Sequence, residues 1–190
     1  MNRPKFIIRP ARMQDAPAIA VAVAMAIGDE QTLRGYCGDD YLSVLTAIAQ
    51  REGTQYSWQH AIVAQCDDKV VGAVVGYDGA LLEQLREGTF AVLRQLISRT
   101  PKLANETVAG EYYLDSIAVM PEYQGVGIGS ALINAFCKRA LAQGHKQVGL
   151  IVDFDNPTVE RLYTSQGFKR IGERLFFEHK MWHLQRQIVE

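Results

Sequence analysis

Residues 112–129 read YYLDSIAVMPEYQGVGIG, and this stretch decides the fold of the chain. The apolar run that opens it predicts a strand, which ends at Pro121. Gly125, Gly127 and Gly129 then alternate in a loop directly before an amphipathic segment, SALINAFCKRALAQ. Glycine lets the backbone turn sharply and approach a ligand closely, and the first N–H groups of a helix lack intrahelical partners. The stretch therefore predicts a strand, a phosphate-binding loop and a helix.

Two motifs together indicate a family. The loop Gln124–Gly129 has the pattern Q-x-x-G-x-G. A second segment has the pattern N-x-x-x-x-x-x-Y-x-x-x-G-F, from Asn156 through Tyr163 to Gly167-Phe168. With both motifs in this order and at this separation, residues 109–172 resemble the acetyl-coenzyme-A-binding core of the GNAT superfamily of N-acetyltransferases. The N-terminal half fits that family by the order of its elements only.

The whole chain predicts one α/β (α+β) domain over residues 1–190, without internal repeats, low-complexity tracts or linkers. The family resemblance implies a mixed central sheet of six to seven strands, with helices on both faces and a splay between the fourth and fifth strands. The expected strands beside the central one are 6–9, 61–66, 70–77, 147–152, 168–171 and 175–184. The expected helices are 16–27, 41–50, 81–99 in two pieces around Gly88, 130–143 and 157–166, and residues 28–40 are expected to form a loop.

The cofactor-binding core covers about residues 109–172. Outside it, residues 28–58 and residues 79–105 are predicted to shape the side of the molecule that binds the acceptor. In the first, Asp29-Glu30 and Asp39-Asp40 lie where relatives form the acceptor pocket. These acidic residues either attract a cationic amine or belong to a solvated loop. The second is longer than the family pattern requires and is either a substrate-side element or a packing appendage.

Composition and charge limit the partners. The 190 residues carry a net charge of −1, so there is no global electrostatic case for nucleic acid or a membrane surface. The most apolar run, Ala16–Ile27, is too short to span a bilayer. Three widely spaced cysteines form no metal pattern and, without a signal-peptide pattern, fit a reducing compartment. The sequence thus predicts a soluble cytoplasmic protein without a metal, whose partner is a small-molecule or peptide amine. Because dimers are common among relatives, a homodimer is a candidate assembly.

The resemblance implies specific contacts to acetyl-CoA. Backbone groups of Ile117, Ala118 and Val119 would bond the pantetheine arm, and one N–H would hold the thioester carbonyl, where negative charge develops. Asn156 would act as a helix N-cap and as a cofactor contact. The family often has arginine where this chain has Gln124, so binding would depend more on backbone. The pyrophosphate would be held by N–H groups along the loop, from Gln124, Gly125, Val126, Gly127, Gly129 and Ser130.

Amide formation requires a base for the amine and an acid for the departing thiolate. Tyr163 matches the family position whose hydroxyl faces the sulfur of CoA, so it is predicted to be the general acid. Glu111 is predicted to be the base, because it lies 13 residues before Gln124, where histone-acetylating relatives place a catalytic glutamate. Asp115, four residues further along the same strand, and a chain of bound water are the alternatives.

The sequence therefore predicts direct transfer of an acetyl group from acetyl-CoA to a primary amine in a ternary complex. One alternative is a sensor of the same fold that binds acyl-CoA without turnover, although Tyr163 favours catalysis. The other is a dinucleotide-binding protein in which Asp153 ends the next strand. Residues 120–124 separate the strand from the glycines and the G-x-G-x-x-G register is absent, which disfavours that alternative. His179 and His183 lack a third ligand nearby and are expected to be surface or packing residues.

Overall fold

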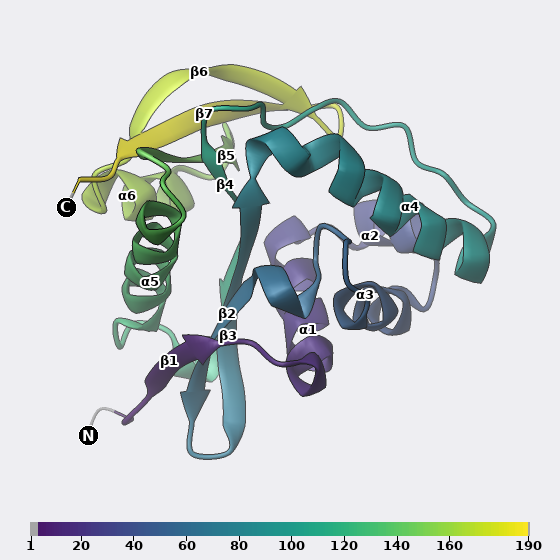
Figure 1. The fold of residues 1–190 in the computed structure, drawn as a ribbon, viewed down its shortest axis with the longest axis horizontal. Helices are drawn as coiled ribbons and strands as arrows, with labels where there is room; N and C mark the ends of the chain where they lie inside the picture. Colours follow the sequence, from purple (N-terminus) through teal and green to yellow (C-terminus); the bar gives the residue numbers. More distant parts are fainter. Residues whose placement is uncertain (1–3, 190) are drawn as a thin grey trace.

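A seven-stranded mixed sheet forms the centre of the computed structural model, which describes residues 4–189 (Figure 1). The ends of the predicted domain, residues 1–3 and 190, lie outside the described residues. The strands stand in the order β1-β2-β3-β4-β5-β7-β6, and neighbours are antiparallel except β4 and β5, which are parallel. They are β1 (Ile7–Pro10), β2 (Ala61–Cys66), β3 (Lys69–Asp78), β4 (Tyr112–Val119), β5 (Gln147–Asp153), β6 (Lys169–Phe176) and β7 (His179–Gln187).

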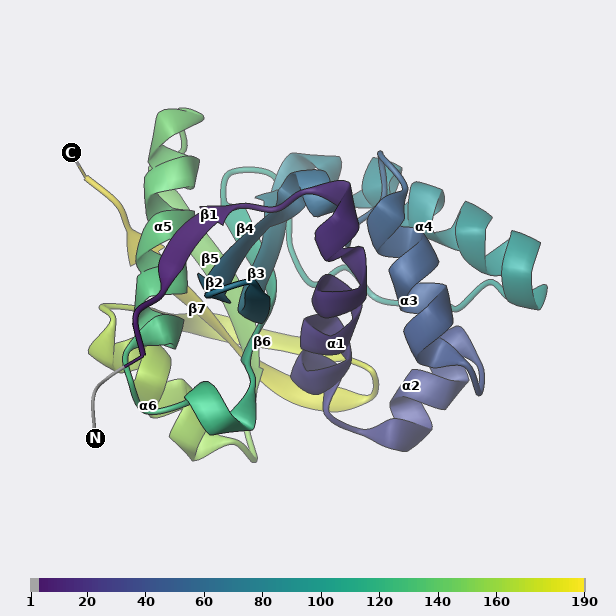
Figure 2. The ribbon, with the colours of Figure 1, turned by 90° about the horizontal axis from the view of Figure 1, so that it is seen from below.

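Helices cover both faces of this sheet, as predicted (Figure 2). The chain contains α1 (Ala16–Ile27), α2 (Glu30–Cys37), α3 (Tyr41–Gln50), α4 (Leu82–Ile97), α5 (Ile128–Ala142) and α6 (Pro157–Ser165). Successive strand residues point to opposite faces, so Ala61 and Val63 of β2 pack with α1 and α3, whereas Ile62 and Ala64 pack with α5. Burial on both faces explains why β2 and β3 are almost continuously apolar.

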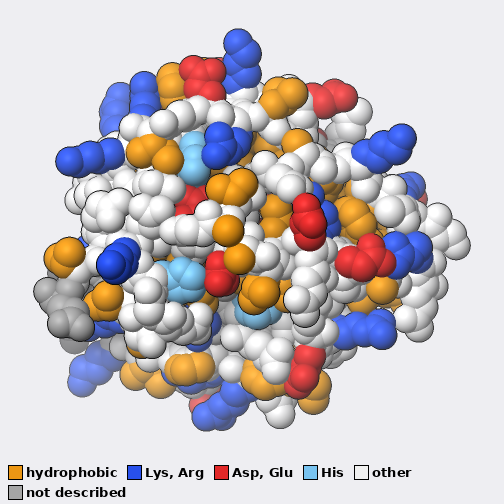
Figure 3. All heavy atoms as spheres, turned by 45° about the horizontal axis from the view of Figure 1, so that its top comes forward, with side chains coloured by type: hydrophobic (Ala, Val, Ile, Leu, Met, Phe, Trp, Pro, Cys, Tyr) orange, Lys and Arg blue, Asp and Glu red, His pale blue; other side chains and the backbone are white. Residues whose placement is uncertain are grey.

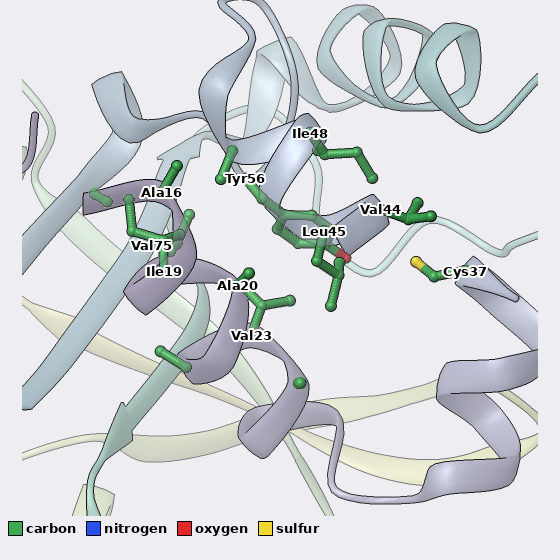
Figure 4. Packing of buried hydrophobic residues seen from close by; sticks show 14 of the residues in the cluster. Ala16, Ile19, Ala20, Val23, Cys37, Val44, Leu45, Ile48, Tyr56 and Val75 are labelled. Atoms are coloured by element: carbon green, nitrogen blue, oxygen red, sulfur yellow. The ribbon is translucent and has the colours of Figure 1, made fainter. Parts of the chain in front are cut away.

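One core layer lies on a single side of the sheet, where α1 packs on the strands and α3 packs on α1. Figure 4 shows Ile19 of α1 beside Val75 of β3, on the sheet side of the helix, and Val23 of α1 on the side toward Leu45 and Ile48 of α3. Alanines on α1 let the two helices approach closely, and all five of these larger side chains are fully buried. This layer positions the C-terminal end of α1 next to the sheet.

The parallel strands β4 and β5 diverge after a short contact, which confirms the predicted splay. Within residues 4–189 their ladder contains only the pairs Tyr112↔Val148 and Tyr113↔Gly149. On the other side of β4, the register with β3 shifts and Asp115 has no partner, which makes it the extra residue of a β-bulge. β4 therefore leaves one backbone edge unpaired beyond the contact.

The loop predicted over residues 28–40 is wrong, because residues Glu30–Cys37 form helix α2. The Asp29 carboxylate caps this helix by accepting a hydrogen bond from the Thr32 N–H at 2.6 Å. Arg34 pairs with Glu30 one turn earlier at 2.9 Å. Gly38, with φ of +78°, ends the helix instead of marking a loop.

The predicted break at Gly88 is also wrong, since α4 runs through it without interruption. A side chain at Gly88 would collide with the carbonyl oxygen of Gly53. The glycine therefore permits the close approach of α4 to the segment after α3, and it does not end a helix.

The bounds predicted for the last two strands are wrong as well. Strand β6 continues to Phe176, and the turn consists of Phe177 and Glu178, whose φ angles are +46° and +65°. Residues 172–174, which fall between the two predicted strands, belong to β6, and the register with β7 shifts between Arg170 and Gly172. At the tip of the hairpin, Phe177 packs edge-on against Tyr36 of α2, with ring centroids 5.9 Å apart.

The surface carries both signs of charge. Figure 3 shows acidic and basic side chains mixed over the face that includes β6 and β7, together with histidines and hydrophobic groups. Among the helices of residues 4–189, none combines the length and apolarity that crossing a membrane requires.

Candidate active site

A cavity of about 550 Å³ lies at the splay between β4 and β5. Its walls come from β4, β5, the start of α6, the junction of α1 and α2, and the tip of the β6–β7 hairpin. Segment 28–58 contributes Gly28, Asp29, Thr32 and Tyr56 to these walls. The described residues of segment 79–105 contribute none, although Glu106 directly follows it. The cavity thus joins the splay to the N-terminal helices.

The glycine loop presents free backbone donors at the start of α5. Gly125 and Gly127 have φ angles of +75° and +98°, which favour glycine, whereas Gly129 lies in the first helical turn with an ordinary φ. The first backbone hydrogen bond of α5 is donated by the Ala131 N–H to the Gly127 carbonyl at 3.0 Å. Within residues 4–189, the N–H groups of residues 125–130 donate no hydrogen bond. Six donors at the positive end of a helix are suited to phosphate oxygens.

Gln124 is already engaged in the loop. Its backbone N–H donates to the Pro121 carbonyl at 3.2 Å. Its side-chain Nε2 donates to the Val119 carbonyl at 2.8 Å. Gln124 therefore braces the loop against the end of β4, and the free donors begin at Gly125.

The second motif brings Asn156 and Tyr163 to the cavity wall. Asn156 is the N-cap of α6, since its Oδ1 accepts from the Val159 N–H at 3.2 Å. Tyr163 is 6% exposed and packs edge-on against Phe168. Its hydroxyl has no hydrogen-bond partner in the described part of the chain. Burial raises the pKa of Tyr163 well above its usual value, so the hydroxyl keeps its proton.

Glu111 lies outside the cavity wall and is 1% exposed. Its carboxylate accepts hydrogen bonds from Thr107 at 2.6 Å and Gln185 at 2.7 Å, and it contacts His183 Nε2 at 2.9 Å. Burial alone would raise the pKa of Glu111, but these hydrogen bonds outweigh it and lower the pKa. The carboxylate also fills the space above Gly149, where a side chain would collide with it. Glu111 thus links β4, β5 and β7 at the closed end of the splay.

Asp115, the bulged residue of β4, lines the cavity. Its carboxylate accepts hydrogen bonds from the Tyr77 hydroxyl and the Ser116 hydroxyl, both at 2.9 Å. Burial raises the pKa of Asp115 to about 6. The structure therefore brings Asp115, and not Glu111, together with Tyr163 at the cavity.

A second buried carboxylate, Glu106, also lines the cavity and was missed by the sequence reasoning. It is 2% exposed, forms an ion pair with Arg86 and accepts a hydrogen bond from Gln55 Nε2 at 3.3 Å. Gln55 Nε2 also donates to the Tyr77 hydroxyl at 3.0 Å, which connects Glu106 to Asp115. Burial, and then the charge of Asp115, raise the pKa of Glu106 to about 7. Glu106 lies in an irregular segment, so no periodicity in the sequence identifies it.

The chain belongs to the acetyltransferase (GNAT) family, whose model matches residues 31–168. This membership agrees with the splayed sheet, the glycine loop and the cavity, and it excludes the dinucleotide-binding alternative. A solved structure described as an acetyltransferase is 30% identical, with a TM-score of 0.81 over 96% of this chain and 100% of that one.

Two named relatives match over shorter stretches. The mycothiol acetyltransferase of Paenarthrobacter aurescens (strain TC1) is 40% identical over 70 residues, which is 37% of this chain and 21% of that protein. The thialysine N-epsilon-acetyltransferase of Sus scrofa is 36% identical over 72 residues, which is 37% of this chain and 39% of that protein. The chain thus spans well under half the length of these relatives.

Proposed function

We propose that the chain is an acetyl-CoA-dependent N-acetyltransferase that moves an acetyl group directly to a primary amine of a small molecule or peptide. The observation that carries this proposal is a single cavity lined by a protonated, unpartnered Tyr163 hydroxyl and by the Asp115 carboxylate. An acid and a base at one cavity are the equipment that amide formation requires. Family membership supports acetyl transfer.

The described residues provide backbone groups and a side chain that can bind acetyl-CoA. The N–H groups of residues 125–130 are free to bind the pyrophosphate oxygens. Beyond Tyr113, β4 has no strand partner on the β5 side in residues 4–189, so the backbone groups of Ile117, Ala118 and Val119 that point to this edge can meet the pantetheine arm, apart from the Val119 carbonyl, which accepts from Gln124. Asn156 lies at the wall between these regions and α6.

Bound acetyl-CoA supplies the thioester whose acetyl group is transferred. Asp115 accepts one proton from the acceptor ammonium, and the neutral nitrogen forms a C–N bond to the acetyl carbon as the C–S bond breaks. Tyr163 gives its proton to the sulfur and takes the second proton that the nitrogen loses. Asp115 then releases its proton to solvent, so the net reaction produces an amide, free CoA and one proton.

We assign the base to Asp115, although Glu111 was the first prediction. The Glu111 carboxylate has three hydrogen-bonding partners and no place in the cavity wall. Its role as base stays a prediction that the Glu111→Gln and Asp115→Asn variants separate. Loss of transfer in the first variant with retention in the second would restore the original assignment.

Direct transfer in a ternary complex is supported by the positions of the cysteines. Cys37, Cys66 and Cys137 are all buried, and none of them lines the cavity. Initial rates measured over a matrix of acetyl-CoA and amine concentrations should give intersecting double-reciprocal lines. Parallel lines, together with an acetylated enzyme seen by mass spectrometry, would overturn direct transfer. Binding of acetyl-CoA without transfer to any amine would favour the sensor alternative.

A further inference from the structure

We infer that the acceptor is a dication, whose reacting ammonium binds near Asp115 and Glu106 and whose second ammonium binds near Asp29 and Asp153. This inference rests on the proposed function and adds the substrate class.

The cavity wall has an unbalanced charge. Five carboxylates line it, from Asp29, Glu106, Asp115, Asp153 and Asp155, and among the described residues the wall contains one histidine and no lysine or arginine. The whole chain has 20 basic and 21 acidic residues, so overall composition does not explain this imbalance. A wall of this kind attracts cations and repels carboxylate-bearing ligands.

The end of the cavity near Asp115 and Glu106, here called the inner end, has one carboxylate more than it has positively charged partners. Glu106 has Arg86 as its ion-pair partner, but Asp115 accepts only from the neutral hydroxyls of Tyr77 and Ser116. When both carboxylates are ionised, one negative charge therefore remains without a counter-charge beside a buried pair. Such a charge is costly in a protein interior, and an ammonium group in the cavity supplies the missing partner.

The opposite end of the cavity, here called the outer end, contains a second cluster of carboxylates, from Asp29, Asp153 and Asp155. His179 Nδ1 lies 3.0 Å from Asp153 Oδ2, and the Asp155 N–H donates to Asp153 Oδ1 at 2.8 Å. Asp29 lines the same cavity as Asp153, Asp155 and His179, and its pKa is lowered, mainly by its hydrogen bonds to Thr32 and in smaller part by the charge of His179. Three carboxylates against a single histidine leave this end negative.

The two ends are separated by a length that suits a short diamine. Tyr113 is level with Gly149, so Asp115 lies two residues and Asp153 four residues beyond that level. The difference of two residues corresponds to about 7 Å along the strand direction, and the splay of β4 from β5 adds a lateral distance to it. Between them the wall includes the apolar side chain of Ile151. An extended aliphatic diamine, with an ammonium at each end and an apolar middle, spans a separation of this order.

An independent observation shows that the cavity is built for a ligand. The Tyr163 hydroxyl reaches its wall from a side chain that is 94% buried, since only 6% is exposed. It has no hydrogen-bond partner within residues 4–189. The side chain is buried but its hydroxyl opens into the cavity without a protein partner, so a ligand or water there can complete its hydrogen bonding.

Three acceptors with the same chain length test the inference: putrescine, n-butylamine and γ-aminobutyrate, whose far ends are cationic, neutral and anionic. We expect kcat/KM for putrescine to exceed that for n-butylamine by roughly tenfold or more, with γ-aminobutyrate poorest. In the Asp29→Asn/Asp153→Asn variant, the ratio of putrescine to n-butylamine should fall toward one. Asparagine keeps the N-cap at position 29. The matched control Asp68→Asn, in the exposed β2–β3 turn, should keep the wild-type ratio.

The outcomes separate the inference from the proposed function. Equal rates for putrescine and n-butylamine, or a preference for γ-aminobutyrate, overturn the inference while transfer itself upholds the function. Calorimetry provides a readout besides turnover, because putrescine should bind the protein–CoA complex more tightly than n-butylamine does. Bound acetyl-CoA without transfer to putrescine also overturns the inference. Absence of acetyl-CoA binding refutes the function and the inference together.

Discussion

Replacing Asp115 by asparagine removes the carboxylate that takes a proton from the acceptor and leaves the side chain almost the same size. A positioned general base contributes roughly 10²- to 10⁴-fold to a rate. We therefore expect Asp115→Asn to lower kcat/KM for the acceptor by about that factor. The affinity for acetyl-CoA should change little, because Asp115 lies away from the glycine loop that binds the pyrophosphate.

The wild-type pH profile follows from the raised pKa of Asp115, which burial brings to about 6. A carboxylate works as a base only when ionised, so activity is lost as the pH falls through this pKa. The ratio of ionised to protonated Asp115 is about 10 to 1 at pH 7 and about 1 to 10 at pH 5, so kcat/KM should fall roughly tenfold between them. Glu106, with its pKa near 7, is joined to Asp115 through Tyr77, so the observed transition belongs to the pair.

Release of the CoA thiol is the assay, with saturating acetyl-CoA and acceptor below its KM, from pH 5 to pH 8. Circular dichroism at each pH confirms that the variant and the wild type remain folded. A flat wild-type profile over this range would refute the reasoning. So would an Asp115→Asn enzyme within a few-fold of the wild-type rate.

Three further predictions concern the acid, the closed end of the splay and the loop. Tyr163→Phe should lower turnover roughly 10²-fold or more with nearly unchanged acetyl-CoA affinity by calorimetry; unaltered turnover would remove Tyr163 from the mechanism. Glu111→Gln should lower the free energy of unfolding in urea by about 1–3 kcal/mol at pH 7, because a buried hydrogen-bonded carboxylate is lost. Since the pKa of Glu111 is lowered by folding, this stabilisation is present above its usual pKa and is lost as the pH falls through the folded value; a loss that is the same at every pH would contradict this account. Gly127→Ala, at a φ of +98°, should weaken acetyl-CoA binding by roughly fivefold or more. Gly144→Ala, at +85° beyond the other end of α5, carries similar strain but should leave that affinity unchanged, and an equal loss in both variants would argue against a cofactor role for the loop.

The cofactor half of the molecule could be predicted from the sequence because its signals are local. Glycines at alternate positions require special backbone angles, and Gly125 and Gly127 have them. Asn156 before a proline is an N-cap signature, and the structure confirms that cap. These features depend on neighbours within one turn, so a pattern of residues is sufficient to find them. The splay between β4 and β5 followed from the family that these patterns resemble.

The elements that the sequence did not predict depend on contacts distant in the chain. Gly88 looks like a helix break until its packing against Gly53 is known. The hairpin turn at Phe177-Glu178 contains no glycine, and Phe177 is held there by packing against Tyr36. No local turn signal marks this position, so the bounds predicted for the two strands around it are wrong.

The acid–base residues show the same limit. Strand alternation puts Glu111 and Asp115 on one face, but the bulge at Asp115 breaks the alternation. The two carboxylates consequently have different surroundings, and only Asp115 lines the cavity. Glu106 joins it through Gln55 and Tyr77, which come from other parts of the chain. Only the folded structure brings these groups together.

The most direct test of the central claim is a single-turnover experiment with the protein in excess over acetyl-CoA, after calorimetry has established binding. The account predicts that, when a primary amine is added, free CoA and N-acetylated amine appear in equal amounts and no acetyl group remains on the protein. Failure to bind acetyl-CoA, or tight binding with no acetylated product across small-molecule and peptide amines, would contradict it.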